Sequence, residues 1–484
     1  MAHIIRTDET SYGKAAFLAD VGRYTAFLKS CEIRQESRIM LTMENSYEFL
    51  IAFFALMNMG CSIVLVDCMT DEREVNEIAL DSKSRLCISD RPLSLDDQVR
   101  TFHVAEGMQY RGDHPAEELS FARWSDREDA LILYTSGSTG KPKGIVKSGH
   151  SFLFNLEESM DIMQYNNQDV LLPLIPFTHF YGLSIVLIWW RTGCDLVICD
   201  YKKIRPILKA ITESGVTVVD GIPSTYYILL QMCKKRERVC TDLKHSAVRM
   251  WCVGGAPLSQ ELAEGFSAVL DQPLLDGYGL SEVGNVALNT RDYREGCGKP
   301  LPSVKIKVVD HQGAELPAGQ LGEIYIQSPG MMNGYLDLPE KTASVLAEGW
   351  FKTNDLGCLN EQGNLYVLGR KGNEIVRKGY VIYPAHIETK LENELKLRGR
   401  VVSLQDEKKG AYMILFVETE LPLTQQMERA INETLGSILK PDKIVFIPAF
   451  PYRPNGKVDL VALQNLAAQW KSSREEEGTC MVQP

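Results

Sequence analysis

The chain has 484 residues, of which 45% are apolar and 24% charged, and its formal net charge is −11. This composition is typical of a globular protein with a sizeable core and excludes wholesale disorder. The acidic balance argues against a nucleic-acid partner, because such proteins usually carry a basic excess or stripe. It leaves small anionic substrates open, since these need only a local positive site.

Neither a secretory signal nor a membrane span is visible. The first residues contain no apolar core segment. The apolar run 183–190 falls far short of the ~20 residues that cross a bilayer. The twelve cysteines form no C-x-x-C pair, so we expect reduced, mostly buried thiols, no zinc site and a cytoplasmic location.

The first 280 or so residues alternate between strand-like and helix-like segments. Strands are predicted at 37–43, 61–67, 85–89, 217–223, 248–254 and 273–279. Helices are predicted at 46–59, 71–82, 224–235 and 258–269. This alternation predicts an α/β fold with parallel-rich sheets flanked by helices.

The pattern changes near residue 300. Short strands at 303–309, 321–327 and 365–368 predict a small antiparallel, β-barrel-like subdomain. A compact α+β pattern follows. Its strands are expected near 375–382, 400–405, 411–418 and 443–448, and its helices near 386–397, 423–437 and 459–472. We therefore expect a large N-terminal domain (1–369), a hinge (370–373) and a small mobile C-terminal domain (374–484).

One string, TSGSTGKPKG (135–144), directly follows an apolar strand at 130–134. Glycines allow backbone N–H groups to turn inward, hydroxyls donate further hydrogen bonds to oxyanions, and lysines add positive charge. The string therefore predicts a phosphate cradle, although its order differs from the Walker pattern. The alternative is a mobile surface loop. The candidate phosphate-binding residues are Thr135, Ser136, Gly137, Ser138, Thr139, Gly140, Lys141 and Lys143.

This string resembles the signature loop of the adenylate-forming superfamily, which includes acyl-CoA and acyl-carrier-protein synthetases, peptide-synthetase adenylation domains and firefly-type luciferases. Further segments resemble that family's motifs in the expected order, so that the resemblance extends from about residue 10 to 472. They are PFTHFYG (176–182), GGAP (254–257), DGYGLSE (276–282), GWFKTNDL (349–356), GR (369–370), KGY (378–380) and RPNGKV (453–458).

The resemblance implies ATP and Mg²⁺ as cofactors. Beyond the loop, the implied nucleotide-binding residues are Gly254, Gly255, Ala256, Asp276, Gly277, Tyr278, Gly279, Asp355 and Arg370. Tyr278 would pack near adenine and Asp355 would accept hydrogen bonds from ribose hydroxyls. Ser281 would contact phosphate, and Glu282 would help to hold Mg²⁺, which prefers one or two carboxylates plus phosphate oxygens. Lys457 would bridge the acyl carboxylate and the α-phosphate.

Four positions depart from the family pattern. Ser281 replaces Thr, and Asn354 replaces a glycine whose positive φ an asparagine also tolerates. Gly372 holds the hinge position, where Asp or Lys is usual, and Val376 stands where a Lys is common. The segment at Lys378 and Gly379 resembles the loop that enters the site for the thioester step.

The acyl pocket is implied at His179 and Phe180, together with Gly255 and Gly279; by itself, His179 would more often be a core histidine. No Asp occurs between 171 and 194, which disfavours an α-amino acid, and the apolar run after His179 favours a fatty, aryl or other apolar acid. Asp220 ends a predicted parallel strand, the end that faces the ligand crevice in open α/β sheets. It is either a turn or helix-start residue or a pocket carboxylate for an amine or hydroxyl of the substrate.

The resemblance implies an acid–thiol ligase that forms acyl-AMP and pyrophosphate and passes the acyl group to CoA or to an acyl carrier protein's phosphopantetheine. Lys457, Glu282, Ser281 and His179 are the candidate catalytic residues. One alternative is a stand-alone adenylation enzyme for an amino-bearing acid. Another is a luciferase-type oxygenase or an acyl-adenylate sensor; the intact Lys457, Glu282 and 135–144 loop argue against a sensor without catalysis. The oligomeric state is not predicted.

Overall fold

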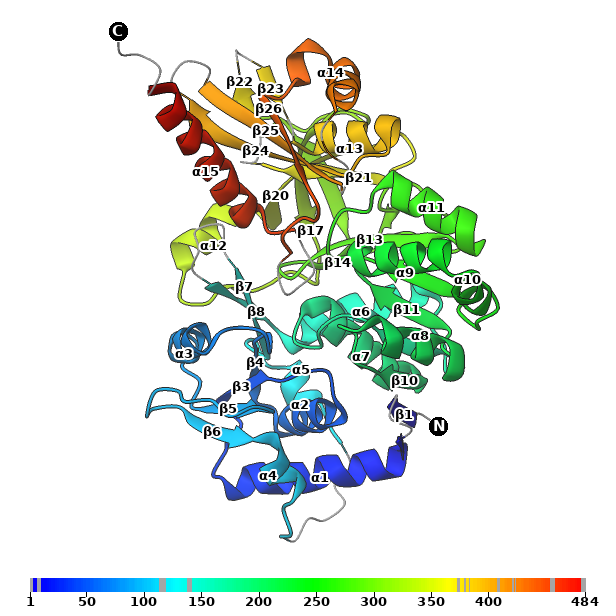
Figure 1. Cartoon of the computed structure of the whole chain (residues 1–484). Coiled ribbons are helices and arrows are strands. Elements are labelled where there is room, and N and C mark those ends of the chain that lie inside the picture. The colour runs from blue at the N-terminus through cyan, green and yellow to red at the C-terminus, as the bar shows by residue number, and fades with distance from the viewer. Residues whose placement is uncertain are drawn as a thin grey trace.

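A computed structural model describes residues 3–6, 10–112, 119–136, 142–371, 375–377, 380–382, 384–406, 410–419, 422, 424–452 and 458–479. It confirms the predicted fold class: two parallel-rich sheets with helices, a curled antiparallel sheet and a small α+β unit. Figure 1 shows the N-terminal part below and the α+β unit above. In the part of the chain that the structure describes, no helix has the length and apolar character needed to cross a membrane.

The first sheet, as far as the chain is described, has nine strands. Their order is β15 (Lys299–Pro300), β14 (Gly284–Leu288), β13 (Leu274–Leu280), β12 (Met250–Val253), β11 (Val218–Gly221), β9 (Val170–Pro173), β10 (Asp195–Ile198), β1 (His3–Arg6) and β2 (Ser11–Gly13). Strands β13 to β1 are parallel, and the outer strands pair antiparallel. The helices in this region are α6 (Gly149–Met163), α7 (Phe180–Thr192), α8 (Ile204–Glu213), α9 (Pro223–Lys235), α10 (Glu237–Lys244) and α11 (Gln260–Leu270).

The second sheet has seven strands in the described residues. Their order is β18 (Gly334–Tyr335), β8 (Pro142–Lys147), β7 (Leu131–Ser136), β4 (Ser62–Leu65), β3 (Arg38–Thr42), β5 (Leu86–Ser89) and β6 (Arg100–His103). Only the pairs that involve β8 are antiparallel. Its helices are α1 (Lys14–Ser30), α2 (Tyr47–Met59), α3 (Glu72–Asp81), α4 (Val104–Met108) and α5 (Ala122–Ser125).

Helices α2 and α7 belong to one buried core that both sheets share. Each is apolar and buried along most of its length, as expected of a helix in the interior. The Ser46 hydroxyl caps α2 by accepting a hydrogen bond from the Phe49 N–H at 3.0 Å, and Gly60, with φ 72°, ends it. The rings of Phe54 and Trp189 meet edge to face at 6.1 Å. The two sheets are therefore packed into a single body.

The third sheet contains β16 (Lys305–Val309), β17 (Gly322–Gln327), β20 (Trp350–Leu359), β19 (Leu346–Ala347) and β21 (Leu365–Arg370), with α12 (Pro339–Val345) beside it. The C-terminal unit contains a hairpin, β22 (Ile375–Arg377) and β23 (Tyr380–Ile382), and a sheet of β24 (Gly399–Asp406), β25 (Gly410–Glu418) and β26 (Lys443–Ile447). Its helices are α13 (Pro384–Leu395), α14 (Gln425–Leu439) and α15 (Leu460–Thr479). Two expectations needed correction: 375–382 is two strands rather than one, and α15 continues past residue 472.

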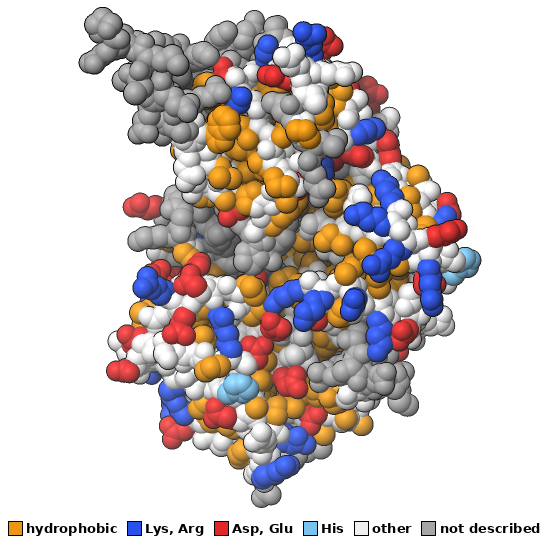
Figure 2. Space-filling model, in the orientation of Figure 1, with side chains coloured by type: hydrophobic (Ala, Val, Ile, Leu, Met, Phe, Trp, Pro, Cys, Tyr) orange, Lys and Arg blue, Asp and Glu red, His pale blue; other side chains and the backbone are white. Residues whose placement is uncertain are grey.

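The cysteines that the structure describes are free thiols, and most are buried. Burial raises the pKa of several of them, for example that of Cys87 to about 12. Charge is distributed unevenly over the surface. Figure 2 shows Lys and Arg side chains gathered on the right of the view, over the region of α8 to α11. The net charge of −11 therefore says little about the local field on this face.

Candidate functional site

Described motif residues from distant parts of the chain contact one another in two groups, one at Glu282 and one at Asp355. Strands β7 and β8 pair antiparallel, with Thr135 opposite Lys143 and Ser136 opposite Pro142. The tip of the predicted phosphate loop, from Gly137 through Ser138, Thr139 and Gly140 to Lys141, lies outside the described residues, and so do the side chains of Thr135 and Ser136. The described part of this motif is therefore the β7–β8 pair and the Lys143 side chain.

Lys143, Glu282 and Tyr335 form what we call the glutamate cluster. The Lys143 Nζ donates to Glu282 Oε1 at 3.2 Å and to the Tyr335 hydroxyl at 2.7 Å. The Tyr335 hydroxyl in turn donates to Glu282 Oε1 at 3.1 Å. Burial lowers the pKa of Lys143, and the Glu282 carboxylate opposes that shift. Glu282 is only 8% exposed, so the cluster keeps a carboxylate and an ammonium group together in a mostly dry setting.

The glutamate cluster suits a magnesium–phosphate ligand. Within the described ranges, no three His, Cys, Asp or Glu side chains lie close enough to hold a metal ion. A single carboxylate beside a polyphosphate is sufficient for Mg²⁺, because phosphate oxygens and water supply its other ligands. Ser281 lies half-buried next to Glu282 in the turn between β13 and β14. Sequence reasoning missed Tyr335, which has no motif of its own and reaches Glu282 because β18 pairs with β8.

A second group of motif residues surrounds Asp355 on β20. The Tyr278 hydroxyl donates to Asp355 Oδ2 at 2.6 Å, and the Arg370 Nε lies 3.6 Å from Asp355 Oδ1. The Asp355 N–H donates to Thr353 Oγ1 at 2.8 Å. Asn354 has φ 58°, which confirms that asparagine adopts the left-handed turn expected here. Asp355 is 9% exposed while the Arg370 side chain is 59% exposed, so the carboxylate is anchored beside a solvent-facing cation.

The glycine motif directly follows β12, the strand that pairs with β13. Gly255 has φ 77°, a conformation that an L side chain rarely adopts. A Cβ on Gly254 would come within 3.2 Å of the Tyr181 ring, and Ala256 follows in the same turn. Gly277 and Gly279 flank Tyr278 on β13, where the ladder to β14 shifts register. Glycines at these positions keep the backbone beside Tyr181 and Tyr278 free of further side chains.

Asp276 also lies on β13. Burial raises its pKa to about 6, although hydrogen bonds from the Cys297 thiol and the Gly277 N–H act in the opposite direction. The structure therefore places this acidic motif residue in a half-buried position, where its partners are a thiol and a backbone N–H.

His179 precedes α7 and faces the edge of the other large sheet. Its Nε2 lies 2.8 Å from Asp67 Oδ2, in the segment after β4. Although burial alone would raise the pKa of Asp67, the hydrogen bond with His179 leaves it below the usual value. The His179 side chain is 39% exposed, so it is not a core histidine. Its neighbour Phe180 is 6% exposed and packs on the Phe152 ring at 5.1 Å.

Asp220, Tyr181 and Cys252 form what we call the aspartate cluster. The Tyr181 hydroxyl donates to Asp220 Oδ1 at 2.9 Å, and Cys252 is the residue opposite Asp220 on β12. Burial raises the pKa of Asp220 to about 7, and Tyr181 and the Cys252 thiol oppose that shift. Among the described residues, Asp220 Oδ2 has no conventional hydrogen-bond partner. No side chain caps α9, so Asp220 is not a helix-start residue. It is a buried carboxyl whose Oδ2 accepts no conventional hydrogen bond from the described residues.

Several predicted residues fall outside the described part of the chain. They are the hinge residue Gly372, the loop residues Lys378 and Gly379, and Lys457. The strands on either side of Lys378 and Gly379 are described, and Val376 pairs with Val381 between them. The buried side chains of Ile375 and Ile382 attach this hairpin to the core of the C-terminal unit.

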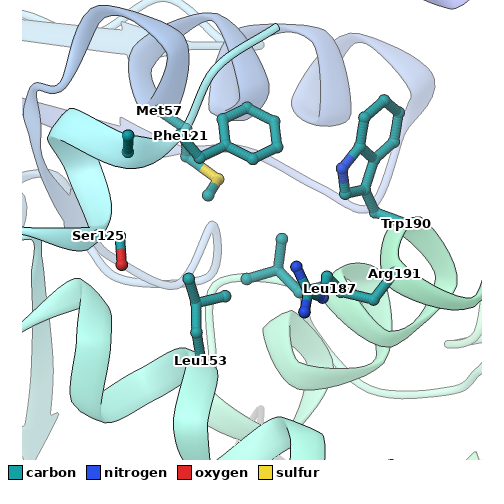
Figure 3. A pocket seen from close by; sticks show the side chains of 8 residues that line it. Met57, Phe121, Ser125, Leu153, Leu187, Trp190 and Arg191 are labelled. Atoms are coloured by element: carbon teal, nitrogen blue, oxygen red, sulfur yellow. The ribbon is translucent and has the colours of Figure 1, made fainter.

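An apolar cavity of about 290 Å³ lies away from the motif residues. Its lining residues are Met57, Phe121, Ala122, Ser125, Leu153, Leu187, Trp190 and Arg191. Figure 3 shows side chains from several helices around this space, with Trp190 and Arg191 at the end of α7. His179 is at the opposite end of α7, roughly 15–20 Å away along the helix. The cavity is therefore separate from the candidate site.

The fold and this convergence of motif residues define an adenylate-forming enzyme fold. A family model described as "AMP-binding enzyme" matches residues 2–336, which is more than half of the chain. The chain belongs to this AMP-binding enzyme family.

Named relatives agree with this assignment. The fatty acid–acyl-carrier-protein ligase ScoC of Streptomyces coeruleorubidus is 29% identical over 89% of this chain and 87% of its own. The structure of ATP-bound MatB from Rhodopseudomonas palustris has a TM-score of 0.86 at 22% identity, covering 96% of this chain and 95% of MatB. The o-succinylbenzoate CoA synthetase MenE of Bacillus subtilis, in complex with ATP and magnesium, has a TM-score of 0.82 at 24% identity over 94% of both chains. These two structures are similar to this chain in fold.

Proposed function

We propose that this protein is an ATP-dependent acid–thiol ligase. It would activate a carboxylic acid as acyl-AMP and transfer the acyl group to CoA or to the phosphopantetheine of an acyl carrier protein. The observation that carries the proposal is the convergence of distant motif residues. Lys143 meets Glu282 across 139 residues, and Tyr278 meets Asp355 across 77. Reduced thiols support a cytoplasmic location.

In the first step an oxygen of the substrate carboxylate attacks the α-phosphorus of ATP. A new acyl–phosphate bond forms, the bond to the bridging oxygen breaks, and pyrophosphate leaves. Two anions must approach each other, so preorganised positive charge supplies most of the protein's contribution. Lys143 and the 135–144 loop would bind the terminal phosphates, and Lys457 would neutralise the developing charge at the α-phosphorus. Bound beside Glu282, Mg²⁺ would stabilise the pyrophosphate leaving group.

In the second step the acceptor thiolate attacks the acyl carbon. A carbon–sulfur bond forms, the mixed anhydride breaks, and AMP leaves. Tyr278, Asp355 and Arg370 would hold the nucleotide through this step. A rotation about the 370–373 hinge would withdraw Lys457 and bring in the loop at Lys378 and Gly379, a conformational gate of a common kind.

The substrate is proposed to be a fatty, aryl or other non-α-amino acid. The relative ScoC, a fatty acid–acyl-carrier-protein ligase by name, supports an apolar acid and a carrier-protein acceptor. The acyl end of the site would be lined by His179 and Phe180. Asp67 holds the His179 ring. One observation favours a second candidate, an acid with an additional amine or hydroxyl group. Asp220 Oδ2 is buried without a conventional partner, and such a substrate group would supply its missing hydrogen bond.

ATP–pyrophosphate exchange over a panel of acids, followed by product analysis with CoA and with a phosphopantetheinylated carrier protein, tests the function. The variant Lys457→Ala should lose acyl-AMP formation by about 10²–10³-fold, as for removal of one preorganised electrostatic group. It should retain thioester formation from synthetic acyl-AMP. Exchange at the wild-type rate in this variant would exclude the role assigned to Lys457. Absence of exchange with every acid would exclude the ligase.

A further inference from the structure

Lys147 is a fully buried lysine with no place in the reaction described above. Its side chain has 0% exposure and is among the largest fully buried side chains in the described residues. It lies on β8, four residues after Lys143. Because side chains alternate along a strand, both lysines project from the same face as Ile145. Ile145 packs into the core shared by the two large sheets, whereas Val146 packs into a separate cluster on the opposite face.

The Lys147 amine contacts two main-chain carbonyls from distant segments. Its Nζ donates to the Gly330 carbonyl at 2.5 Å and to the Glu282 carbonyl at 3.5 Å. The Phe180 ring lies 5.4 Å from the same nitrogen. Lys143 contacts the carboxylate of Glu282, so the two lysines of β8 hold the side chain and the main chain of one residue.

The segment from 330 to 333 is attached to the same place by backbone hydrogen bonds. The Met332 N–H donates to the Glu282 carbonyl at 2.6 Å, and the Asn333 N–H donates to the Val146 carbonyl at 2.8 Å. Tyr335, which contacts the Glu282 carboxylate, follows directly on β18. Lys147 therefore lies where three segments meet directly behind the glutamate cluster.

Placing an amine at this buried position costs more free energy than placing an apolar side chain there. Burying a polar group costs free energy unless hydrogen bonds compensate, and an apolar side chain of similar length would fill the same volume without that cost. Whether the amine is charged or neutral, it can donate to both carbonyls. The advantage of Lys147 over an apolar residue is therefore that its amine links two main-chain carbonyls from distant segments.

We propose that Lys147 is a positioning residue that joins the Glu282 main chain to the Gly330 segment, so that the Glu282 carboxylate stays aligned with Lys143 and Tyr335 for the magnesium–ATP complex. The proposal rests on the function proposed above. It predicts that loss of the amine weakens nucleotide binding more than acid recognition, because both hydrogen bonds of Lys147 hold main chain at and behind the glutamate cluster, whereas its contact on the acyl side is limited to the Phe180 ring.

The test is Lys147→Met in the full-length protein. Binding of the non-hydrolysable analogue AMPCPP with Mg²⁺, measured by isothermal titration calorimetry, should weaken about five- to tenfold, as for the loss of one or two hydrogen bonds. The KM for ATP in pyrophosphate exchange should rise by a similar factor, and the KM for the acid should change less. The melting temperature should fall only modestly, because Met fills the same volume but leaves the Gly330 carbonyl without this donor.

The matched control is Val146→Ala on the opposite face of β8, which should lower the melting temperature without weakening AMPCPP binding. AMPCPP affinity within twofold of wild type in a folded Lys147→Met protein would overturn the proposal. So would equal losses in Val146→Ala. If Lys147→Met does not fold, Lys147→Leu applies the same criteria. These outcomes are separate from failure of the proposed function, which would appear as absence of exchange in the wild-type protein.

Discussion

The glutamate cluster and the aspartate cluster are built from different kinds of residues. In the glutamate cluster, Lys143 and Glu282 both belong to sequence motifs, and the two groups carry opposite charges. In the aspartate cluster, Asp220 lies at a strand end outside every motif and meets a tyrosine and a thiol. The first arrangement suits a ligand common to a whole class of enzymes, such as a nucleotide triphosphate. The second arrangement suits recognition of a chemical group that only one particular acid substrate carries.

The largest expected effect would break the glutamate cluster. Glu282→Gln preserves shape but removes the charge. Pyrophosphate exchange should fall about 10²-fold or more with every acid, because Lys143 loses its charged partner and the proposed magnesium site would lose its carboxylate. The matched control is Asp169→Asn, which breaks another buried carboxylate–cation pair, with Arg249 at 2.7 Å, away from the motifs. This control should change stability more than exchange. Wild-type exchange in Glu282→Gln would contradict the assignment.

A second experiment asks whether the aspartate cluster selects the acid. If the spare oxygen of Asp220 binds an amine or hydroxyl group, Asp220→Asn should reduce kcat/KM about tenfold for acids with that group and much less for plain apolar acids. Exchange kinetics on matched acid pairs provide the comparison. Equal effects on both classes would leave Asp220 as a purely structural residue.

The aspartate cluster should also make stability depend on pH. The pKa of Asp220 is raised to about 7 in the folded protein, above its value in an unfolded chain, so the folded state retains the proton longer. The stability that this carboxyl contributes is therefore fully present below the unfolded pKa, near 4, and is lost as the pH rises toward 7. Urea unfolding from pH 4 to 8 should show that the wild-type free energy of unfolding decreases relative to that of Asp220→Asn. Parallel pH curves for the two proteins would refute this assignment.

The smallest expected effect is on the binding of ATP. Tyr278→Phe removes the hydrogen bond to Asp355 and should raise the KM for ATP about three- to tenfold, equally for all acids, because one hydrogen bond to a charged group is lost. Steady-state exchange at varied ATP concentration measures it. An effect that varied from acid to acid would show that Tyr278 belongs functionally with the aspartate cluster.

Much of the fold could be predicted because it follows from local pattern. The apolar run at 46–59 is too long for a strand, and it forms α2. The run at 61–67 contains the buried strand β4. Asn354 adopts the expected positive φ. The short strands β9 and β10 and the N-terminal strands β1 and β2 were not predicted. Runs of three or four residues contain too little periodicity to distinguish a strand from a loop.

The sequence by itself determined the class of fold, the order of the motifs and the chemical types of the site residues. These depend on side-chain identity and on spacing within short segments. Tertiary structure alone decided the pairs: Tyr335 with Glu282, Asp67 with His179 across 112 residues, and Tyr181 with Asp220. It also turned Lys147, one more lysine in the sequence, into a buried amine behind Glu282. Such contacts depend on how sheets pack and which strands pair, and no local pattern contains that information.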